Sequence, residues 1–275
     1  MIDILLSTYN GAAYISAQLD SIIPQDYTDW QLTVRDDGST DNTMAILQDY
    51  AKRYPSIHID SSETAHLGCL RSFEYLLKKS NGDYVMLADQ DDVWLKDKIT
   101  RTLQTMLHAE AQFGTSAPLL VYTDLRPVDS ELHVLDNSFW HYARIKPELL
   151  ETPRCLAVNN CVSGCTTMMN QSALACVTPF GKQAYVHDAV MALKVLKNGG
   201  HLIRLNEQTI LYRLHNSNTI GGAKVEINAS YIAYKLRTCK QVIARNVRDY
   251  HQAHEVIGIR PITFIIHRIM YLLKR

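Results

Sequence analysis

The chain has 275 residues, of which 47% are hydrophobic and 20% are charged. This composition excludes a disordered or fibrous chain, because it supplies enough apolar surface for a core. The 28 Lys and Arg residues balance the 28 Asp and Glu residues. No overall field therefore attracts nucleic acid, and we expect no nucleic-acid partner. The charges are unevenly spread, since acids concentrate in the N-terminal part and the C-terminal tail is basic.

The N-terminal part alternates short apolar runs with segments of helical spacing. The apolar runs predict strands at Ile2–Ser7, Trp30–Arg35, Ile57–Ile59 and Tyr84–Ala88. The helical spacing predicts helices over Ala12–Ile23, around Met44–Tyr50, over Leu70–Lys79 and through Lys98–Leu107. This alternation is typical of βαβ units, which build a mostly parallel sheet covered by helices on both faces.

The second half of the sequence is less regular. It predicts strands at Leu119–Tyr122, Cys161–Met168 and Thr209–Leu214, and helices at His187–Leu196 and Ser230–His251. We therefore predict an α/β fold with a mostly parallel twisted sheet flanked by helices. One domain over residues 1–225 and a basic helical extension over residues 226–275 account for the length better than two domains.

The N-terminus and the cysteines predict a cytoplasmic protein. The first residues carry an acid and no basic segment, which is unlike a secretory signal. No apolar run approaches the roughly 18 residues that span a bilayer. The six cysteines form no C-x-x-C pair, so buried free thiols are favoured over a zinc site.

Polar clusters follow three of the predicted strands. They are Ser7–Asn10, Asp36–Asp37 and Asp89–Asp92. The carboxyl ends of parallel strands form the ligand crevice of an open sheet, so these clusters predict one site. Three carboxylates within four residues repel one another, and a hard divalent cation such as Mg²⁺ or Mn²⁺ offsets that repulsion. The alternative is a solvated turn in which Asp92 caps the next helix.

Four further residues carry candidate roles, each with a plainer alternative. Asp37 can accept a hydrogen bond from a pyrimidine N–H, or it can serve only the Asp-Gly turn. Asp188 can act as a general base, or it can cap the helix that begins beside it. Arg213 and His215 can contact phosphate at a strand end, or they can belong to a surface loop. The sequence has neither G-x-G-x-x-G nor a Walker A motif, so metal neutralisation of a diphosphate replaces a glycine-rich cradle.

Three motifs together resemble family 2 glycosyltransferases of the GT-A fold. They are Leu6-Ser7-Thr8-Tyr9-Asn10-Gly11, Asp36-Asp37-Gly38-Ser39-Thr40-Asp41 and Asp89-Gln90-Asp91-Asp92-Val93-Trp94. The resemblance covers roughly residues 1–220. The D-Q-D-D-x-W form and the later stretch Arg213, His215 and Asn218 most resemble bacterial enzymes of surface-polysaccharide assembly, among which rhamnosyltransferases are frequent.

The resemblance implies a nucleotide-diphosphate sugar donor, UDP- or dTDP-linked and including dTDP-rhamnose, with inverting transfer to a hydroxyl. It implies that Asp188 is the catalytic base, although His187 replaces the Glu usual before it. Asp91 and Asp89 would hold the metal, with His215 beside them. The remaining assignments all concern the donor: Ser7, Thr8 and Tyr9 line the nucleoside pocket, Asp37 binds the base, and Arg71 and Arg213 contact the diphosphate.

The basic tail suggests where the acceptor lies. Its last stretch, Ile262–Leu273, is apolar, so it can rest on an anionic membrane or pack on the domain or a dimer partner. Enzymes similar to this one often act on glycan or undecaprenyl-linked acceptors at the inner membrane, which favours the membrane.

Two other functions were weighed against the glycosyltransferase. A nucleotidyltransferase should carry a basic glycine-rich loop, which Thr8–Gly11 is not. A non-catalytic sugar-nucleotide-binding or scaffold protein requires that Asp89, Asp91 and Asp188 do not converge.

Overall fold

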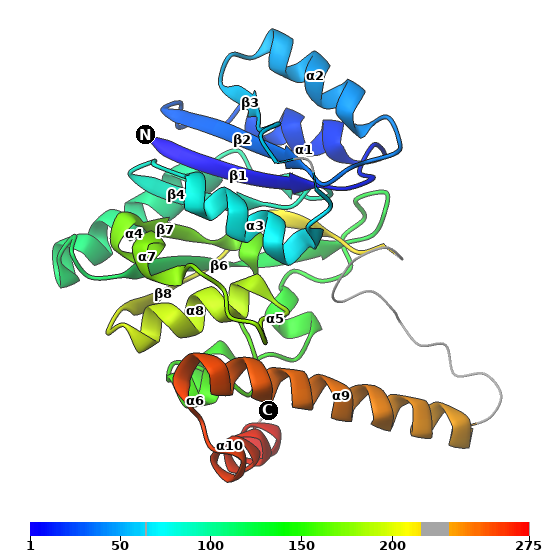
Figure 1. Cartoon of the computed structure of the whole chain (residues 1–275), viewed down its shortest axis with the longest axis vertical. Coiled ribbons are helices and arrows are strands. Elements are labelled where there is room, and N and C mark those ends of the chain that lie inside the picture. The colour runs from blue at the N-terminus through cyan, green and yellow to red at the C-terminus, as the bar shows by residue number, and fades with distance from the viewer. Residues whose placement is uncertain (64, 216–230, 275) are drawn as a thin grey trace.

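The computed structural model describes residues 1–63, 65–215 and 231–274, with side chains of the last segment described from residue 240 onward. An eight-stranded sheet lies at its centre, in the order β3-β2-β1-β4-β7-β6-β8-β5 (Figure 1). The strands are β1 (Ile2–Thr8), β2 (Trp30–Asp36), β3 (Ile57–Ile59), β4 (Tyr84–Ala88), β5 (Val93–Trp94), β6 (Leu119–Val128), β7 (Met168–Asn170) and β8 (His201–Arg213).

The sheet has a parallel half and a mixed half. The strands β3, β2, β1 and β4 run parallel to one another. The short strand β7 is antiparallel to both β4 and β6, whereas β6 and β8 are parallel to each other. The predicted mostly parallel sheet is therefore confirmed, and the exception lies in the half where the sequence is less regular.

Helices cover both faces of the sheet. The longer ones are α1 (Ile15–Ile22), α2 (Thr43–Arg53), α3 (Gly68–Lys79), α4 (Lys98–Phe113), α7 (Gln171–Val177), α8 (His187–Lys197), α9 (Tyr231–Ile257) and α10 (Pro261–Lys274). Short turns of helix occur at α5 (Phe139–Tyr142), η1 (Pro147–Leu149), α6 (Pro153–Leu156) and η2 (Gly164–Thr166).

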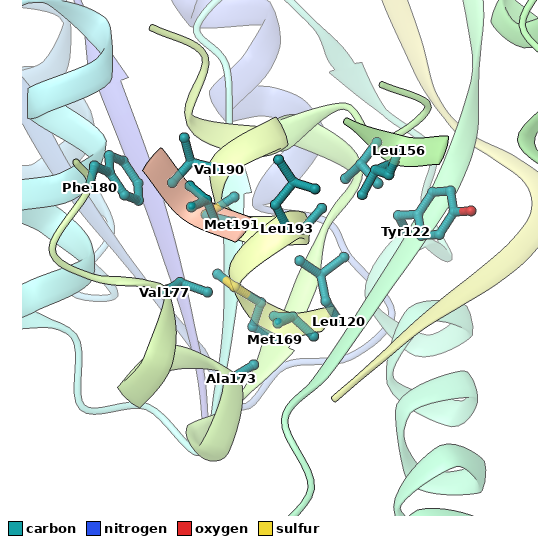
Figure 2. Packing of buried hydrophobic residues seen from close by; sticks show 14 of the residues in the cluster. Leu120, Tyr122, Leu156, Met169, Ala173, Val177, Phe180, Val190, Met191 and Leu193 are labelled. Atoms are coloured by element: carbon teal, nitrogen blue, oxygen red, sulfur yellow. The ribbon is translucent and has the colours of Figure 1, made fainter. Parts of the chain in front are cut away.

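Side-chain alternation along the strands creates two hydrophobic clusters. In β1, Ile4 and Leu6 pack in the cluster that includes α1, α2 and α4, whereas Leu5 packs in the cluster of α3, α7 and α8. This is the period of two that a strand buried on both faces requires. Figure 2 shows the second cluster, in which Val190 and Met191 of α8 lie among side chains from the sheet and from α7.

The predicted strand over Cys161–Met168 is wrong. Only Met168 lies in a strand, and residues 164–166 form the 3₁₀ turn η2. The Thr166 hydroxyl donates to the Ser163 carbonyl and the Thr167 hydroxyl to the Gly164 carbonyl, each at 2.7 Å. These local bonds stabilise a turn in a segment whose apolar side chains are nonetheless buried.

The C-terminal helices pack against the α8 side of the molecule. Ala253 and Val256 of α9 and Phe264 and Tyr271 of α10 belong to the same hydrophobic cluster as α8. The predicted basic helix is therefore present as α9. The predicted boundary at residues 225 and 226, Asn218 and the expected start of that helix at Ser230 lie outside the described residues. Within the described ranges, no helix has both the length and the apolar character needed to cross a bilayer.

Candidate active site

The carboxyl ends of β1, β2 and β4 bring the three polar clusters to one edge of the sheet. Thr8 pairs with Asp36 across β1 and β2, and Leu6 pairs with Ala88 across β1 and β4. Because these strands are adjacent and parallel, the segments that follow them emerge side by side. Gln90 joins two of the segments directly, since its amide accepts from the Tyr9 N–H at 2.9 Å and donates to the Tyr9 carbonyl at 3.1 Å.

Asp36 serves the turn after β2. Its carboxylate accepts from the hydroxyls of Thr8 at 2.9 Å and Ser39 at 2.6 Å. It also accepts from the backbone N–H groups of Gly38 and Ser39. Gly38 adopts a φ of 89°, a conformation that side chains disfavour. Asp36 therefore stabilises a tight turn that presents its neighbour, Asp37.

Asp37 is buried and held by four partners. Arg35 lies 2.6 Å from Oδ1, the N–H groups of Leu67 and Gly68 each donate at 2.7 Å, and His66 Nδ1 lies 3.0 Å from Oδ2. Burial alone would raise the pKa of Asp37, but Arg35 and the two N–H groups lower it below its ordinary value. This carboxylate is fixed in its charged form.

Exposed rings lie beside Asp37. Tyr9 is 47% exposed, and its ring centroid is 4.9 Å from that of His66. Ser7 and Thr8 precede Tyr9 at the end of β1, and Thr8 is buried by its bond to Asp36. His66 is the Asp37 partner most open to solvent, so a ligand N–H that approaches this carboxylate meets His66 first.

The Asp89–Asp92 turn concentrates negative charge in a buried place. Burial first, and then the charges of Asp91 and Asp188, raise the pKa of Asp89 well above its ordinary value. Asp92 is fully buried, and its Oδ2 has no hydrogen-bond partner among the described residues. Ligand atoms of Asp89, Asp92 and Cys165 lie within 4.8 Å of one another. The buried Lys98 ammonium lies near enough to interact with Asp92, and the remaining carboxylate charge favours a bound cation.

The donors around this turn suit a hard divalent cation. Asp91 Oδ2 lies 2.9 Å from His215 Nε2, and Asp89 is close enough to Asp91 to feel its charge. Carboxylate oxygens are the ligands that Mg²⁺ and Mn²⁺ prefer. Burial keeps the pKa of the Cys165 thiol well above its ordinary value, so this side chain stays protonated and is a poor ligand for such an ion. The carboxylates therefore suit the expected metal, but the ligand atoms that lie within 4.8 Å of one another are those of Asp89, Asp92 and Cys165, whereas Asp91 and His215 form a pair beside them.

Arg213 is integrated into the same turn. Its Nε donates to the Asp91 carbonyl at 3.0 Å, and its backbone N–H donates to Asp92 Oδ1 at 3.3 Å. Its guanidinium also lies 4.7 Å from the ring centroid of Tyr14. The pairing of β5 with β8 explains this arrangement, because it sets the end of β8 beside the acidic turn.

Asp188 faces the acidic turn from the first turn of α8. Its carboxylate accepts from the Asn160 amide at 2.9 Å, the Ala189 N–H at 2.6 Å and the Gly164 N–H at 3.3 Å. Burial outweighs these bonds and raises the pKa of Asp188 to about 7. Asp188 does not cap α8, whose N-cap is Val186 and has no side-chain capping bond. Its raised pKa instead leaves it poised to exchange a proton near neutral pH.

Cys69 marks the convergence of the acids. This residue lies in the first turn of α3, opposite the carboxyl ends of the strands. Although Cys69 is exposed, crowding by the surrounding protein raises the pKa of its thiol, and the charges of Asp89, Asp188, Asp37 and Asp91 act in the same direction. The condition for a non-catalytic scaffold, acids that lie far apart, is not met.

His187 and Arg71 have structural partners. The His187 ring is packed against Phe73, with 4.5 Å between centroids, and burial lowers its pKa to about 4. Arg71 pairs with Glu74 and donates to the carbonyls of Phe180 at 3.2 Å and Gly181 at 2.9 Å. Arg71 therefore connects α3 to the loop before α8, on the side of Asp188.

Three residues of the site were not predicted. Arg35 neutralises Asp37, Asn160 donates to Asp188, and Gly164 gives room to His187, whose Nε2 would lie 2.3 Å from a Cβ at position 164. Arg35 could have been found, because it stands two residues before Asp37 and that spacing shares a strand face. Nothing in the local sequence marks Asn160 or Gly164.

Curated relatives of this chain are bacterial glycosyltransferases. The putative teichuronic acid biosynthesis glycosyltransferase TuaG of Bacillus subtilis is 28% identical over 218 residues, which are 79% of this chain and 81% of TuaG. The dTDP-rhamnosyl transferase RfbG of Shigella flexneri is 37% identical over 121 residues, 42% of each chain. The Escherichia coli glucosyltransferase WfgD is 25% identical over 200 residues, 72% of this chain and 70% of WfgD.

Solved structures share the fold. S. aureus TarS aligns with a TM-score of 0.59 and 18% identity over 78% of this chain and 36% of TarS. The Pyrobaculum calidifontis mannosyltransferase PcManGT, solved with GDP-Man and Mn²⁺, aligns with a TM-score of 0.64 and 19% identity over 98% of this chain and 69% of that chain. These similarities confirm the predicted GT-A-type fold. Residues 3–177 match the family described as glycosyl transferase family 2, and since they form more than half of the chain, the protein belongs to that family.

Proposed function

We propose that this glycosyltransferase moves a sugar from a nucleotide-diphosphate donor to a hydroxyl of a glycan or undecaprenyl-linked acceptor, with inversion, in bacterial surface-polysaccharide assembly. One observation carries the proposal: Asp188, with a pKa near 7, faces Asp89 and Asp91 at the carboxyl edge of a parallel sheet. A base and a cation site at one crevice are what a displacement at an anomeric carbon needs.

The names of the relatives support the donor and the acceptor class. RfbG is a dTDP-rhamnosyl transferase, WfgD is named for UDP-Glc and a diphosphoundecaprenol acceptor, and TarS has been solved with UDP-GlcNAc. We therefore favour a UDP- or dTDP-sugar, dTDP-rhamnose included. We infer from such acceptors that the enzyme works at the cytoplasmic face of the inner membrane. We retain the division into a catalytic domain, residues 1–225, and a C-terminal extension as part of this proposal.

The proposed reaction is a single displacement. The Asp188 carboxylate accepts the proton of the acceptor hydroxyl while that oxygen attacks the anomeric carbon. The bond from this carbon to the donor diphosphate breaks, and its electron pair leaves with the diphosphate from the opposite face. Asn160 and the Gly164 N–H orient Asp188, because each donates to its carboxylate.

The donor would lie along the ends of β1, β2 and β4. Ser7, Thr8 and Tyr9 line the nucleoside side, and Asp37 takes the base N–H when His66 moves aside. Arg213 and Arg71 are the cations nearest to the diphosphate in this proposal. The carbonyl contacts of both guanidiniums fix their positions beforehand, which reduces the entropy lost on binding.

Asp89, Asp91 and His215 would hold Mg²⁺ or Mn²⁺. When bound, the ion neutralises the charge that develops on the leaving diphosphate. Asp91→Ala should abolish the part of nucleotide affinity that EDTA removes from the unaltered protein. Calorimetry with UDP and with dTDP, in the presence and absence of EDTA, measures the nucleotide affinity of the variant and of the unaltered protein. Equal affinity of the unaltered protein with and without EDTA would contradict a metal site.

A donor screen tests the function as a whole. Common UDP-, dTDP- and GDP-sugars are incubated with the full chain and Mg²⁺ or Mn²⁺, and thermal shift and donor hydrolysis are followed. We expect one UDP- or dTDP-sugar to stabilise the protein and to be hydrolysed slowly. Release of pyrophosphate from a nucleoside triphosphate and a sugar phosphate would instead indicate a nucleotidyltransferase.

A further inference from the structure

Helix α10 is apolar on the side that faces away from the protein. Its exposed large hydrophobic residues include Leu273, which is 81% exposed, and Ile262, which is 68% exposed. With about 3.6 residues per turn, these side chains form one broad stripe along the helix. The stripe consists of Ile262, Ile265, Ile266, Ile269, Met270, Leu272 and Leu273.

The opposite side of α10 anchors the helix to the catalytic domain. Phe264 and Tyr271 are buried in the hydrophobic cluster of α8. The Tyr271 hydroxyl accepts from the Asn159 amide at 2.9 Å, and Arg268 donates to the Val158 carbonyl. The exposed stripe therefore lies on the face of α10 away from these contacts. Figure 1 shows α10 at the edge of the molecule, next to α6.

Basic groups flank the stripe. No acidic residue follows Glu255 in the sequence, whereas Arg260 and Lys274 stand at the two ends of α10. A cavity of about 600 Å³ lies between α6, α8 and the two C-terminal helices, and Arg154, Lys197 and His267 contribute to its lining. This is the charge pattern of a surface that meets anionic groups.

We propose that α10 rests in the interface of an anionic lipid bilayer, with its apolar stripe among the acyl chains and the basic residues around it at the headgroup phosphates. A second copy of the chain suits the face less well. Twofold packing of α10 on α10 would bring the basic ends of two copies together. Helix α10 has 14 residues, which suits a helix lying in the interface.

Vesicle flotation tests this proposal with the full chain. Vesicles are made of phosphatidylcholine alone or with phosphatidylglycerol. We expect the protein to float with the anionic vesicles and to bind the neutral ones much less. The double variant Ile265→Asp/Ile269→Asp should lose about tenfold or more of the binding, because two charges would enter the apolar region. Leu107→Asp on α4, which also replaces an exposed apolar residue, should bind like the unaltered chain.

Two results would overturn the proposal. The full chain could remain unbound with anionic vesicles, or the double variant could bind normally while light scattering shows that it has changed from dimer to monomer. Membrane binding by α10 depends on the proposed function only in that the proposed acceptor lies at a membrane. Nucleotide binding, measured on the same samples, reports that function separately, and the double variant should keep it.

Discussion

Two carboxylates at the same sheet edge are prepared in opposite ways. Asp37 has Arg35 and two backbone N–H groups around it, which hold its pKa below the ordinary value. Asp188 has three neutral donors and, within the described part of the chain, no cationic partner, so burial raises its pKa to about 7. The first is a fixed negative charge suited to recognition, and the second is suited to accepting a proton.

The difference between the pKa values of Asp37 and Asp188 comes from the residues that donate to each carboxylate and from the contacts that hold those residues. Arg35 is fully buried and also donates to the Ser72 hydroxyl at 2.7 Å and the Ala65 carbonyl at 2.6 Å. Asn160 is oriented by its two bonds to the Val162 backbone before it reaches Asp188. The guanidinium of Arg35 keeps Asp37 charged, whereas the neutral amide of Asn160 leaves Asp188 able to take up a proton.

The largest effect is expected from Asp188→Asn. The amide retains the size of the carboxylate but cannot take a proton, so the transfer rate should fall by about 10²–10⁴-fold. Donor affinity, measured by calorimetry, should remain nearly unchanged. Weak donor binding in this variant would move Asp188 from catalysis to donor recognition and remove the contrast with Asp37.

Arg35→Met tests the other carboxylate. It leaves Asp37 buried without its counter-ion, so the free energy of unfolding should fall by about 3–5 kcal/mol in urea denaturation at neutral pH. Arg53→Met, which removes the exposed pair with Asp49, is the matched control and should cost no more than about 1 kcal/mol. The double variant Arg35→Met/Asp37→Asn should recover part of the loss. Equal effects of Arg35→Met and Arg53→Met would mean that Asp37 does not depend on Arg35.

Gly164→Ala probes the support of Asp188. The added Cβ would overlap His187 Nε2, so the unfolding free energy should fall by about 1–3 kcal/mol and the transfer rate should decrease with it. His187→Ala should cancel much of this effect when the two changes are combined, and a double-mutant cycle measures that coupling. Additive losses would show that the two side chains do not share the space.

The pH dependence of the transfer rate should show the smallest effect, and it reports the protonation of Asp188 most directly. Asp188 must be deprotonated to act, so its raised pKa makes the rate fall by about tenfold per pH unit below 7 and level off above it. His187 stays neutral in this window, because burial lowers its pKa to about 4. Asp89 titrates in the same window, because burial and the charges of Asp91 and Asp188 raise its pKa to about 7, so the response to a change beside Asp188 identifies the group that titrates. Asn160→Ala removes a bond to the charged form and should shift the inflection to higher pH. A flat profile between pH 6 and 8 would contradict the base role.

The parallel half of the sheet was predictable, and the mixed half was not. From β1 to β4, apolar runs end in polar clusters, and adjacent parallel strands bring those clusters together without further information. Around residues 158–170, the burial of apolar side chains resembles a strand although Thr166 and Thr167 form a turn. Asn160 and Gly164 reach Asp188 only through tertiary packing, 28 and 24 residues away in sequence.

Gln90 connects two parts of the site and so bears on how the binding of two ligands is coupled. It stands between Asp89 and Asp91, and its side chain holds both backbone groups of Tyr9. Gly11 reinforces this link, since a Cβ there would lie 2.3 Å from Gln90 Oε1. In the proposed site, a nucleoside at Tyr9 and a cation at Asp89 are therefore linked through Gln90. By reciprocity, any factor by which one of these ligands changes the affinity for the other applies equally in the opposite direction, whichever arrives first.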